Sequence, residues 1–350
     1  MPLSFLLTDD LIQDLANLNN QFADKFAILK NCNIEELDAL HKYARVSTIG
    51  ASTRIENALL TDIEVNWIDT ILTIDGKLSA FNRNRTLIKN KLSKDRERSI
   101  EEVAGCRAML LLIYANPSDF FPLKENDLRA LHYELMSPYK KAIPYAGKYK
   151  IQSNSVIEKN KFTNEERVIF KTADPGPITS AAMHDLIKWY NNSMFFSPWS
   201  IAITAELVYR FLAIHPFQDG NGRLGRAMFL MSLLHSTSNV ISFVSKYIAI
   251  DRCIEKHKEE YYYVLNRCSD GAFKEDPKKY KIQYFLRFMI KVLQESIEDI
   301  ELYRNRFKAE RLLSTTALSI LNCFKDNPAI RLTTSKIMKD TNLPRRTVVY

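Results

Sequence analysis

The chain has 350 residues, of which 46% are hydrophobic, 11% aromatic and 26% charged, a composition that excludes a disordered protein. Its 9 glycines and 12 prolines are few for this length, which disfavours a many-turned β fold and favours a mostly helical one. No apolar run approaches the roughly 18–20 residues that span a bilayer, and residues 1–10 lack the basic segment of a secretory signal. We therefore expect a cytoplasmic protein that does not contact a membrane.

The net charge of +8 is concentrated at the C-terminal end, because Lys and Arg outnumber Asp and Glu by ten to three in residues 303–350. A basic end on a nearly neutral chain suggests an acidic partner, such as nucleic acid, for that end only. The five cysteines are scattered and contain no CxxC pair. This spacing disfavours a disulfide framework or a zinc site and predicts reduced thiols.

The first hundred residues are predicted to form helices. Leu11, Leu15, Leu18 and Phe22 recur at spacings of three and four residues, as expected for the buried face of a helix. The same pattern predicts further helices at 103–114, 124–136, 178–191, 198–214, 225–235, 251–268 and 279–310. We divide the chain into an N-terminal helical region (1–100), a core (101–300) and a C-terminal unit (310–350).

The helical pattern is interrupted between residues 146 and 177. Segments 148–152 and 167–171 are short, β-prone and separated by polar residues, so they predict a β-hairpin that ends at Asp174-Pro-Gly-Pro177.

The C-terminal unit has the punctuation of a helix-turn-helix. A helix over 317–324 is followed by a segment at 333–341 and then by Leu343-Pro-Arg-Arg-Thr-Val-Val, which predicts a basic second helix. The sequence stops in or just after that helix, so we expect a winged-helix-like module without its wing.

The segment from His215 to Arg226 carries the strongest chemical signal. An apolar helix ends at a histidine followed by proline, and two glycines then flank Asn221 before the next helix begins. A glycine-rich backbone that opens onto a helix N-terminus offers N–H donors and a favourable dipole to an anion.

The charged side chains of this segment complement an anion site. Arg223 and Arg226 are three residues apart, so both can reach a polyphosphate from one helix face. A lone carboxylate, Asp219, suits a phosphate-bound Mg²⁺, which keeps water and substrate oxygens as its other ligands. His215 can accept a proton from a hydroxyl. Together these residues predict phosphoryl or nucleotidyl transfer to a hydroxyl.

Residues 215–226 resemble the Fic motif, HPFx(D/E)GNGRxxR, at every specified position. The resemblance implies a helical Fic core that transfers AMP from ATP to a Ser, Thr or Tyr hydroxyl of a target protein. It implies His215 as the general base and Asp219 as the Mg²⁺ ligand. The ATP-binding residues that it implies in this segment are Asp219, Gly220, Asn221, Gly222, Arg223, Leu224, Gly225 and Arg226.

Ser52-Thr-Arg-Ile-Glu-Asn57 resembles the family's inhibitory motif, (S/T)xxxE(G/N), and lies before the core. The resemblance implies an autoinhibited member in which Ser52, Glu56 and Asn57 are inhibitory. Glu56 would also lie in the ATP site, where it would pair with Arg226 and occupy the guanidinium that orients the γ-phosphate.

Two further parts of the ATP site are implied by resemblance. The 146–177 hairpin is similar to the family's flap, which docks the target protein as an added strand, and its edge residues Val168, Ile169, Phe170 and Lys171 would lie near the nucleotide. Tyr261 and Tyr262 resemble the tyrosine pair of the adenine pocket, although a third tyrosine follows and the register could differ by one. The asparagine common seven residues later is replaced by Ser269.

The sequence thus predicts an autoinhibited protein AMP-transferase that uses ATP and Mg²⁺. One alternative is removal of AMP from a modified protein by the same site, with Glu56 positioning a water. Another is a DNA-binding regulator whose Fic core only senses nucleotide. The 310–350 unit could bind DNA phosphates, a second protein or another copy of the chain in a homodimer.

Overall fold

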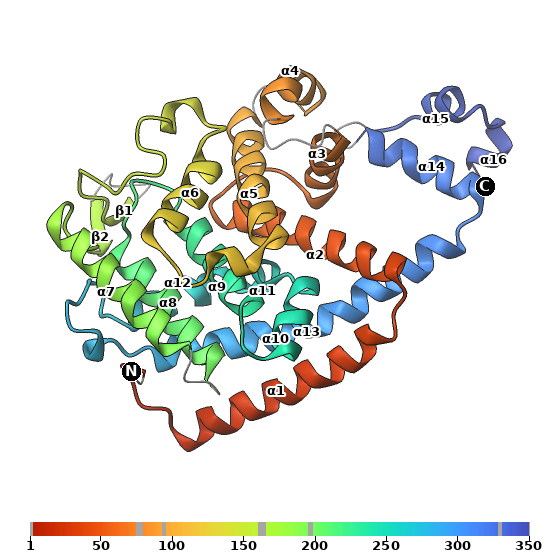
Figure 1. The fold of residues 1–350 in the computed structure, drawn as a ribbon. Helices are drawn as coiled ribbons and strands as arrows, with labels where there is room; N and C mark the ends of the chain where they lie inside the picture. Colours follow the sequence, from red (N-terminus) through yellow and green to blue (C-terminus); the bar gives the residue numbers. More distant parts are fainter. Residues whose placement is uncertain are drawn as a thin grey trace.

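Helices dominate the computed structural model (Figure 1), which confirms the prediction of a mostly helical fold. The residues that it describes are 3–74, 80–92, 96–159, 166–194, 199–327 and 331–349. The strands in these ranges are β1 (Val156–Lys159) and β2 (Glu166–Phe170), which pair antiparallel as a two-stranded sheet.

The first two helices pack against the helices of the core. Helix α1 (Asp9–Lys30) buries the predicted residues Leu11, Leu15, Leu18 and Phe22 and packs along α10 (Asn239–Val244) and α13 (Gln283–Leu312). Helix α2 (Ile34–Ile55) then runs inward, and nearly all of its second half is buried. That half is rich in Gly, Ala, Ser and Thr, whose small side chains let neighbouring helices approach closely.

Helices α3 (Asp62–Ile74) and α4 (Ala80–Leu92) follow α2 and pack beside α5 (Glu97–Ala115). Helix α5 crosses α6 (Glu125–Met136) at Gly105. A Cβ atom at Gly105 would overlap the backbone of Leu135, so only glycine permits this contact.

The centre of the core is α8 (Ser200–Ile214), every residue of which is buried. Its two charged residues, Glu206 and Arg210, pair with each other (3.2 Å), and the rest of the helix is mostly apolar, as expected for an enclosed helix. It packs against α7 (Pro177–Ser193), α9 (Asn221–Leu234) and α13. Helix α9 begins at Asn221 and not at the predicted 225, because Gly220 adopts a φ of 79° and its carbonyl accepts the first helical hydrogen bond, from Leu224.

The predicted helix over 251–268 is wrong in one respect, since it is two helices. They are α11 (Ile250–Lys256) and α12 (Lys258–Arg267), and they meet at His257, whose backbone leaves the helical region (φ −112°, ψ 33°). Short 3₁₀ helices lie at η2 (Pro117–Phe120), η3 (Lys140–Ala142), η4 (Ser245–Tyr247) and η5 (Pro277–Lys279).

The hairpin lies within 146–177, but its first strand is not the predicted 148–152. That segment runs beside the loop after α8 instead, where Tyr149 forms a β-bridge with Phe217 and the Lys150 amide donates to the Pro216 carbonyl (2.8 Å). The Lys150 side chain is buried there, and the strand β1 begins only at Val156.

The C-terminal unit consists of α14 (Thr315–Asp326), α15 (Thr334–Thr341) and α16 (Arg345–Val349) and projects from the end of α13 (Figure 1). The turn between α15 and α16 passes through Asn342 in the left-handed region (φ 57°), and this gives a helix-turn-helix. Across all the described ranges, we find no helix with the length and apolar character required to cross a membrane.

Candidate active site

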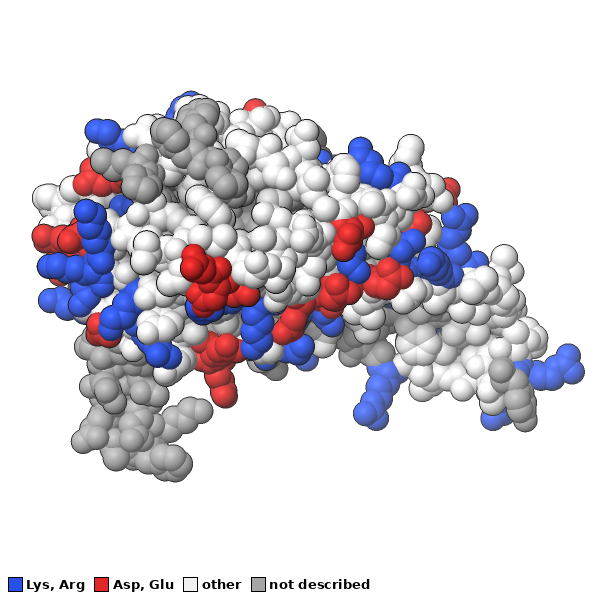
Figure 2. All heavy atoms as spheres, turned by 90° about the horizontal axis from the view of Figure 1, so that it is seen from below, with Lys and Arg blue, Asp and Glu red and all other residues white. Residues whose placement is uncertain are grey.

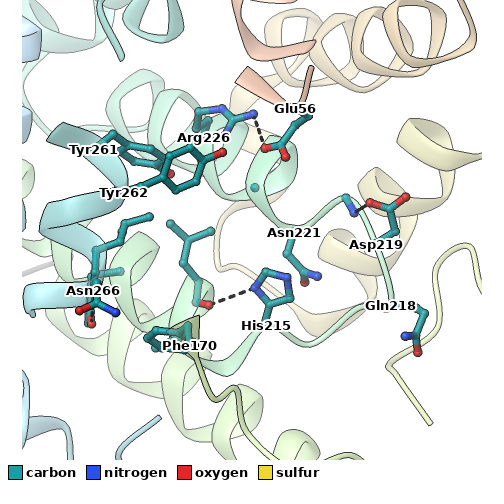
Figure 3. A pocket seen from close by; sticks show the side chains of 16 residues that line it. Glu56, Phe170, His215, Gln218, Asp219, Asn221, Arg226, Tyr261, Tyr262 and Asn266 are labelled. Atoms are coloured by element: carbon teal, nitrogen blue, oxygen red, sulfur yellow. Dashed lines mark hydrogen bonds and ion pairs between the residues drawn. The ribbon is translucent and has the colours of Figure 1, made fainter. Parts of the chain in front are cut away.

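A cavity of about 360 Å³ lies where the α8–α9 loop faces α12 and the end of α2 (Figure 3). His215 and Phe170 lie at one end of it, and Arg226 with Glu56 at the other. The residues that line it are Glu56, Phe170, Tyr209, Leu212, Ala213, His215, Gln218, Asp219, Gly220, Asn221, Gly222, Arg226, Tyr261, Tyr262, Leu265 and Asn266.

His215 caps the C-terminal end of α8 in the left-handed conformation (φ 55°, ψ 59°). Its Nδ1 lies 3.2 Å from the Leu212 carbonyl oxygen, and because that oxygen can only accept, Nδ1 carries the hydrogen. Nε2 is then an acceptor. Burial lowers the pKa of His215 to about 4, so the ring is neutral at pH 7 and can take up a proton.

Asn221 holds the loop in shape from inside. Its side-chain amide donates to the Phe217 carbonyl (2.7 Å), and its oxygen accepts from the Phe217 amide (2.9 Å). Asn221 is buried and both polar groups of its side chain bond within the loop, which leaves only its backbone for the predicted contact with ATP. The first N–H groups of α9 have no acceptor within the helix and lie at the cavity wall, as expected for an anion site.

Two side chains that the sequence analysis missed, the buried Lys150 and the half-buried Asn154, bond to the loop backbone. The Lys150 ammonium donates to the Ile214 carbonyl (3.1 Å), to Thr172 (3.0 Å) and to Asn154 (2.8 Å). The Asn154 amide in turn donates to the carbonyls of His215 (3.2 Å) and Phe217 (2.6 Å). Burial lowers the pKa of Lys150 to about 8.

His132 of α6 is a third missed residue. Its ring stacks on Phe217 with centroids 3.9 Å apart. Nδ1 accepts from the Gly147 amide (2.9 Å), so Nε2 carries the hydrogen and donates to the Asp219 carbonyl (2.9 Å). His132 therefore joins the segment before the hairpin to the loop. Burial lowers its pKa to about 4, which keeps the ring neutral.

Asp219 lies in a cluster of charged groups at the edge of the cavity. Its carboxylate, with 43% of the side chain exposed, accepts from Arg223 and from Arg98 of α5, both at 3.3 Å. Arg223 is buried and does not line the cavity. In the part of the chain that the structure describes, no three His, Cys, Asp or Glu side chains come together as metal ligands. An exposed single carboxylate fits an Mg²⁺ ion whose remaining ligands are phosphate oxygens and water.

At the opposite end of the cavity, Arg226 is buried and binds Glu56, the C-terminal cap residue of α2. Its Nη2 donates to the Glu56 carboxylate (3.0 Å) and to the Ser52 carbonyl (2.8 Å), and its Nε donates to Asp251 of α11 (2.9 Å). Burial opposes the charge, but the carboxylates of Glu56 and Asp251 raise the pKa of Arg226. Glu56 also covers Gly222, where a Cβ atom would overlap its carboxylate.

The remaining residues of the predicted inhibitory motif lie around this pair. Asn57 has a left-handed backbone (φ 70°) and accepts from the Lys258 ammonium (3.1 Å). The Ser52 hydroxyl lies 3.3 Å from the Arg226 Nε.

On the α12 side, Tyr261 and Tyr262 line the cavity, whereas Tyr263 is exposed and lies outside it. Ser269 was predicted in the ATP site, but it is buried beyond the end of α12 and does not line the cavity. Asn266 lines it instead, because it follows Tyr262 by four residues and shares its helix face. That periodicity could have identified Asn266 from the sequence.

Of the predicted hairpin residues, Phe170 lines the cavity. Lys171 does not, because its backbone is paired with the segment after α12, with hydrogen bonds to Gly271 (2.9 Å) and Phe273 (2.8 Å). Val168 and Ile169 belong to strand β2, and their side chains are outside the described part of the structure.

Leu224 and Gly225 were also predicted to bind ATP, but they are core residues. Leu224 is fully buried, and Gly225 packs so closely on Leu212 that a Cβ atom would lie 2.8 Å from its side chain.

The comparisons with known proteins agree with this geometry. The Fic/DOC family matches residues 122–233, which include His132 and the whole 215–226 segment. Curated proteins from Aedes aegypti and Culex quinquefasciatus, both named Protein adenylyltransferase Fic, are 23% identical over 232 residues, which cover 64% of this chain and 39% of theirs. The chain therefore spans about two fifths of the length of these relatives.

Two crystal structures have a similar fold. A Fic family protein from Desulfovibrio desulfuricans G20 has a TM-score of 0.58 at 22% identity and covers 99% of this chain and 88% of its own. A Fic domain containing signaling protein from Bacteroides thetaiotaomicron has a TM-score of 0.59 at 22% identity, with coverage of 81% and 98%. The loop and these matches together show a Fic domain over residues 122–233.

Proposed function

We propose that this protein is a protein AMP-transferase that Glu56 holds in an autoinhibited state. The observation that carries the proposal is the ion pair between Glu56 and Arg226, which lies in the same cavity as His215 and the N-terminus of α9. Relatives named Protein adenylyltransferase Fic support AMP transfer as the reaction.

ATP would bind with its phosphates at the N-terminus of α9 and its adenine beside Tyr262 and Asn266. The neutral His215 accepts the proton of the target hydroxyl at Nε2 while the hydroxyl oxygen bonds to the α-phosphorus. The bond from the α-phosphorus to the bridging oxygen breaks, and pyrophosphate leaves. Mg²⁺, bound by Asp219 and phosphate oxygens, would supply charge neutralisation. Catalysis would come chiefly from positioning and from charge stabilisation.

Glu56 would inhibit this reaction in two ways. Its carboxylate occupies the Arg226 Nη2 that a γ-phosphate oxygen needs, and it repels that phosphate. It also covers the open face of Gly222, where the nucleotide backbone would approach. A nucleotide can then enter the cavity only in a pose in which the phosphates are misplaced.

The target protein would dock on strand β2 as an added strand. The backbone of Lys171 is already paired with Gly271 and Phe273, so the added strand would end before Lys171. The target chain would then lie beside Phe170, which lines the cavity near His215.

The test is labelling of protein with α-³²P-ATP, with γ-³²P-ATP as the control for phosphorylation. Glu56→Gly should raise labelling about 10- to 100-fold, the equivalent of losing a charged hydrogen bond. His215→Ala in that background should abolish it. Glu259→Gly, on the exposed start of α12, is the matched control and should leave labelling unchanged.

The alternative reaction gives the opposite response. If Glu56 positions a water for removal of AMP, Glu56→Gly lowers the release of AMP from a modified protein and does not raise labelling. That result would reject AMP transfer as the main activity.

We further propose that the C-terminal unit binds DNA through its basic second helix. The supporting observation is the turn at Asn342, which sets α16 beside α15 with Arg345 and Arg346 both exposed.

A further inference from the structure

We propose that Asp251 is a positioning residue, which keeps the Arg226 guanidinium aimed into the cavity whether or not Glu56 is bound to it. This inference rests on the proposed function, because it assigns Arg226 to the γ-phosphate of ATP. Asp251 belongs to neither the Fic motif nor the inhibitory motif.

The two carboxylates contact different nitrogens of the same guanidinium. Asp251 accepts from Nε (2.9 Å), whereas Glu56 accepts from Nη2 (3.0 Å). The Asp251 contact therefore does not compete for the Nη2 hydrogen that Glu56 accepts, and another anion could accept it in place of Glu56. The Ser52 carbonyl (2.8 Å from Nη2) supports the same orientation from the side.

The two carboxylates also differ in their surroundings. The Asp251 side chain is 3% exposed, whereas the Glu56 side chain is 32% exposed and lines the cavity. Asp251 is anchored by α11, whose residues Ile250, Cys253 and Ile254 are buried in the interfaces with α2 and α13. Glu56 is the C-terminal cap residue of α2, after the last helical turn.

These differences separate a permanent partner from an exchangeable one. An arginine buried to this extent needs a counterion at all times, since an unpaired buried charge is strongly disfavoured. Asp251 supplies that counterion after Glu56 leaves. Arg226 then stays in place and exchanges the Glu56 carboxylate for a γ-phosphate oxygen without a change of its own conformation.

The experiment compares ATP and AMP binding by calorimetry in the Glu56→Gly background, because AMP lacks the γ-phosphate that Arg226 would contact. Asp251→Ala should weaken ATP binding about tenfold and change AMP binding less than about twofold. Asp251→Asn retains an oxygen acceptor for Nε but loses the charge, so its ATP affinity should lie between those of the Asp251→Ala and the Glu56→Gly proteins. Asp299→Ala removes the partner of the adjacent Arg252 and is the matched control, with no change expected.

Each other outcome has a definite meaning. Equal loss of ATP and AMP affinity in Asp251→Ala would indicate general damage to the cavity and overturn the proposal. No loss of either affinity would overturn it as well. If Asp251→Ala does not fold, Asp251→Ser, whose hydroxyl is too short to reach Nε, takes its place with the same expectations. If Glu56→Gly alone does not prefer ATP to AMP, it is the proposed function that fails.

Discussion

At the residue scale, the site depends on buried polar side chains that fix the loop backbone and do not themselves meet a ligand. His132 is the clearest of them, because both ring nitrogens are used and the ring stacks on Phe217. Losing it would leave the Gly147 amide and the Asp219 carbonyl without partners, which costs about 1–3 kcal/mol for each buried group. The neutral ring also links the stability of the loop to pH.

We predict that acid destabilises the fold through its buried histidines. Burial lowers the pKa of His41, His132 and His215 to about 4, whereas an unfolded chain takes up these protons near pH 6.5. The stability that the neutral rings provide is therefore fully present above pH 6.5 and is lost as the pH falls towards 4.

The measurement is urea unfolding of wild type and His132→Phe at pH 7 and pH 5. The variant keeps the ring stack but loses both ring hydrogen bonds, so it should be less stable than wild type at pH 7. Because it also lacks the titrating group, it should lose less stability between pH 7 and pH 5. His184→Phe, on the exposed surface of α7, should keep the wild-type dependence. An equal loss of stability in wild type and His132→Phe would contradict a neutral His132.

Sequence reasoning found the site residues that lie close together in the sequence and missed those that lie far from the loop in the sequence. The loop residues His215, Asp219 and Arg226 lie within one short segment, where spacing alone indicates their chemistry. Lys150 and Asp251 approach the same site through the fold, and neither belongs to a local pattern. A lysine in a polar, β-prone stretch is expected at the surface, so only the structure shows that it is buried under the loop.

At the element scale, the end of α2 brings Glu56 to the wall of the cavity and is held there by ion pairs. Arg54, two residues before Glu56, forms a two-pronged ion pair with Glu255 of α11, at 2.7 and 2.9 Å. It also donates to the Leu60 carbonyl (3.0 Å) and to Asp62 (2.8 Å). The helix end is thereby fastened to the same helix that carries Asp251, which sets the position of Glu56 over Gly222.

We predict that breaking this pair weakens the proposed inhibition without removing it. Arg54→Met should raise labelling from α-³²P-ATP about three- to tenfold, less than Glu56→Gly, because Glu56 keeps its own contact with Arg226. Glu255→Gln should give a similar rise in labelling. The double variant should be labelled only slightly more than either single variant, since both substitutions remove the same contact. Asp62→Asn, on the exposed side of Arg54, is the control and should have the smaller effect.

Additive effects of Arg54→Met and Glu255→Gln would show that the two residues act separately.

The inhibitory motif predicted Glu56 from the sequence, but Arg54 occupies one of its unspecified positions. Its role follows from the turn of α2 that points it at α11, and no spacing in the sequence reports that contact.

The elements themselves show where sequence patterns lose information. The 3.6-residue periodicity identified the long helices because each buries one face in the core. It could not detect the break at His257, since α11 and α12 both continue the apolar pattern. The strand prediction at 148–152 failed for a different reason, because its extended backbone bonds to the loop at Pro216 and Phe217 and not to a neighbouring strand.

At the scale of the whole molecule, charge is distributed differently over the Fic core and the C-terminal unit. On the face shown in Figure 2, acidic and basic side chains alternate along the core, whereas basic side chains project from the far end of the C-terminal lobe. Several of the core's surface charges are paired, for example Arg287 with Asp14 and Lys291 with Glu260. The basic surplus therefore lies at the end of α13 and in α14–α16, which extend away from the cavity.

We predict that this unit binds duplex DNA and that the Fic domain does not need it for AMP transfer. Arg345 and Arg346 begin α16, the second helix of the helix-turn-helix, and both are exposed. Replacing both with Gln should weaken binding to a duplex about tenfold or more and flatten its dependence on salt, because each lost phosphate contact lowers the slope by about one.

The Lys278→Gln, Lys279→Gln double variant removes two cations from the core and should bind as wild type. Labelling of protein with α-³²P-ATP should be unchanged in both, since α16 has no contact with the cavity. Binding that is absent at low salt, or that survives the loss of both arginines, would leave the unit as a site for a protein partner or a second copy of the chain.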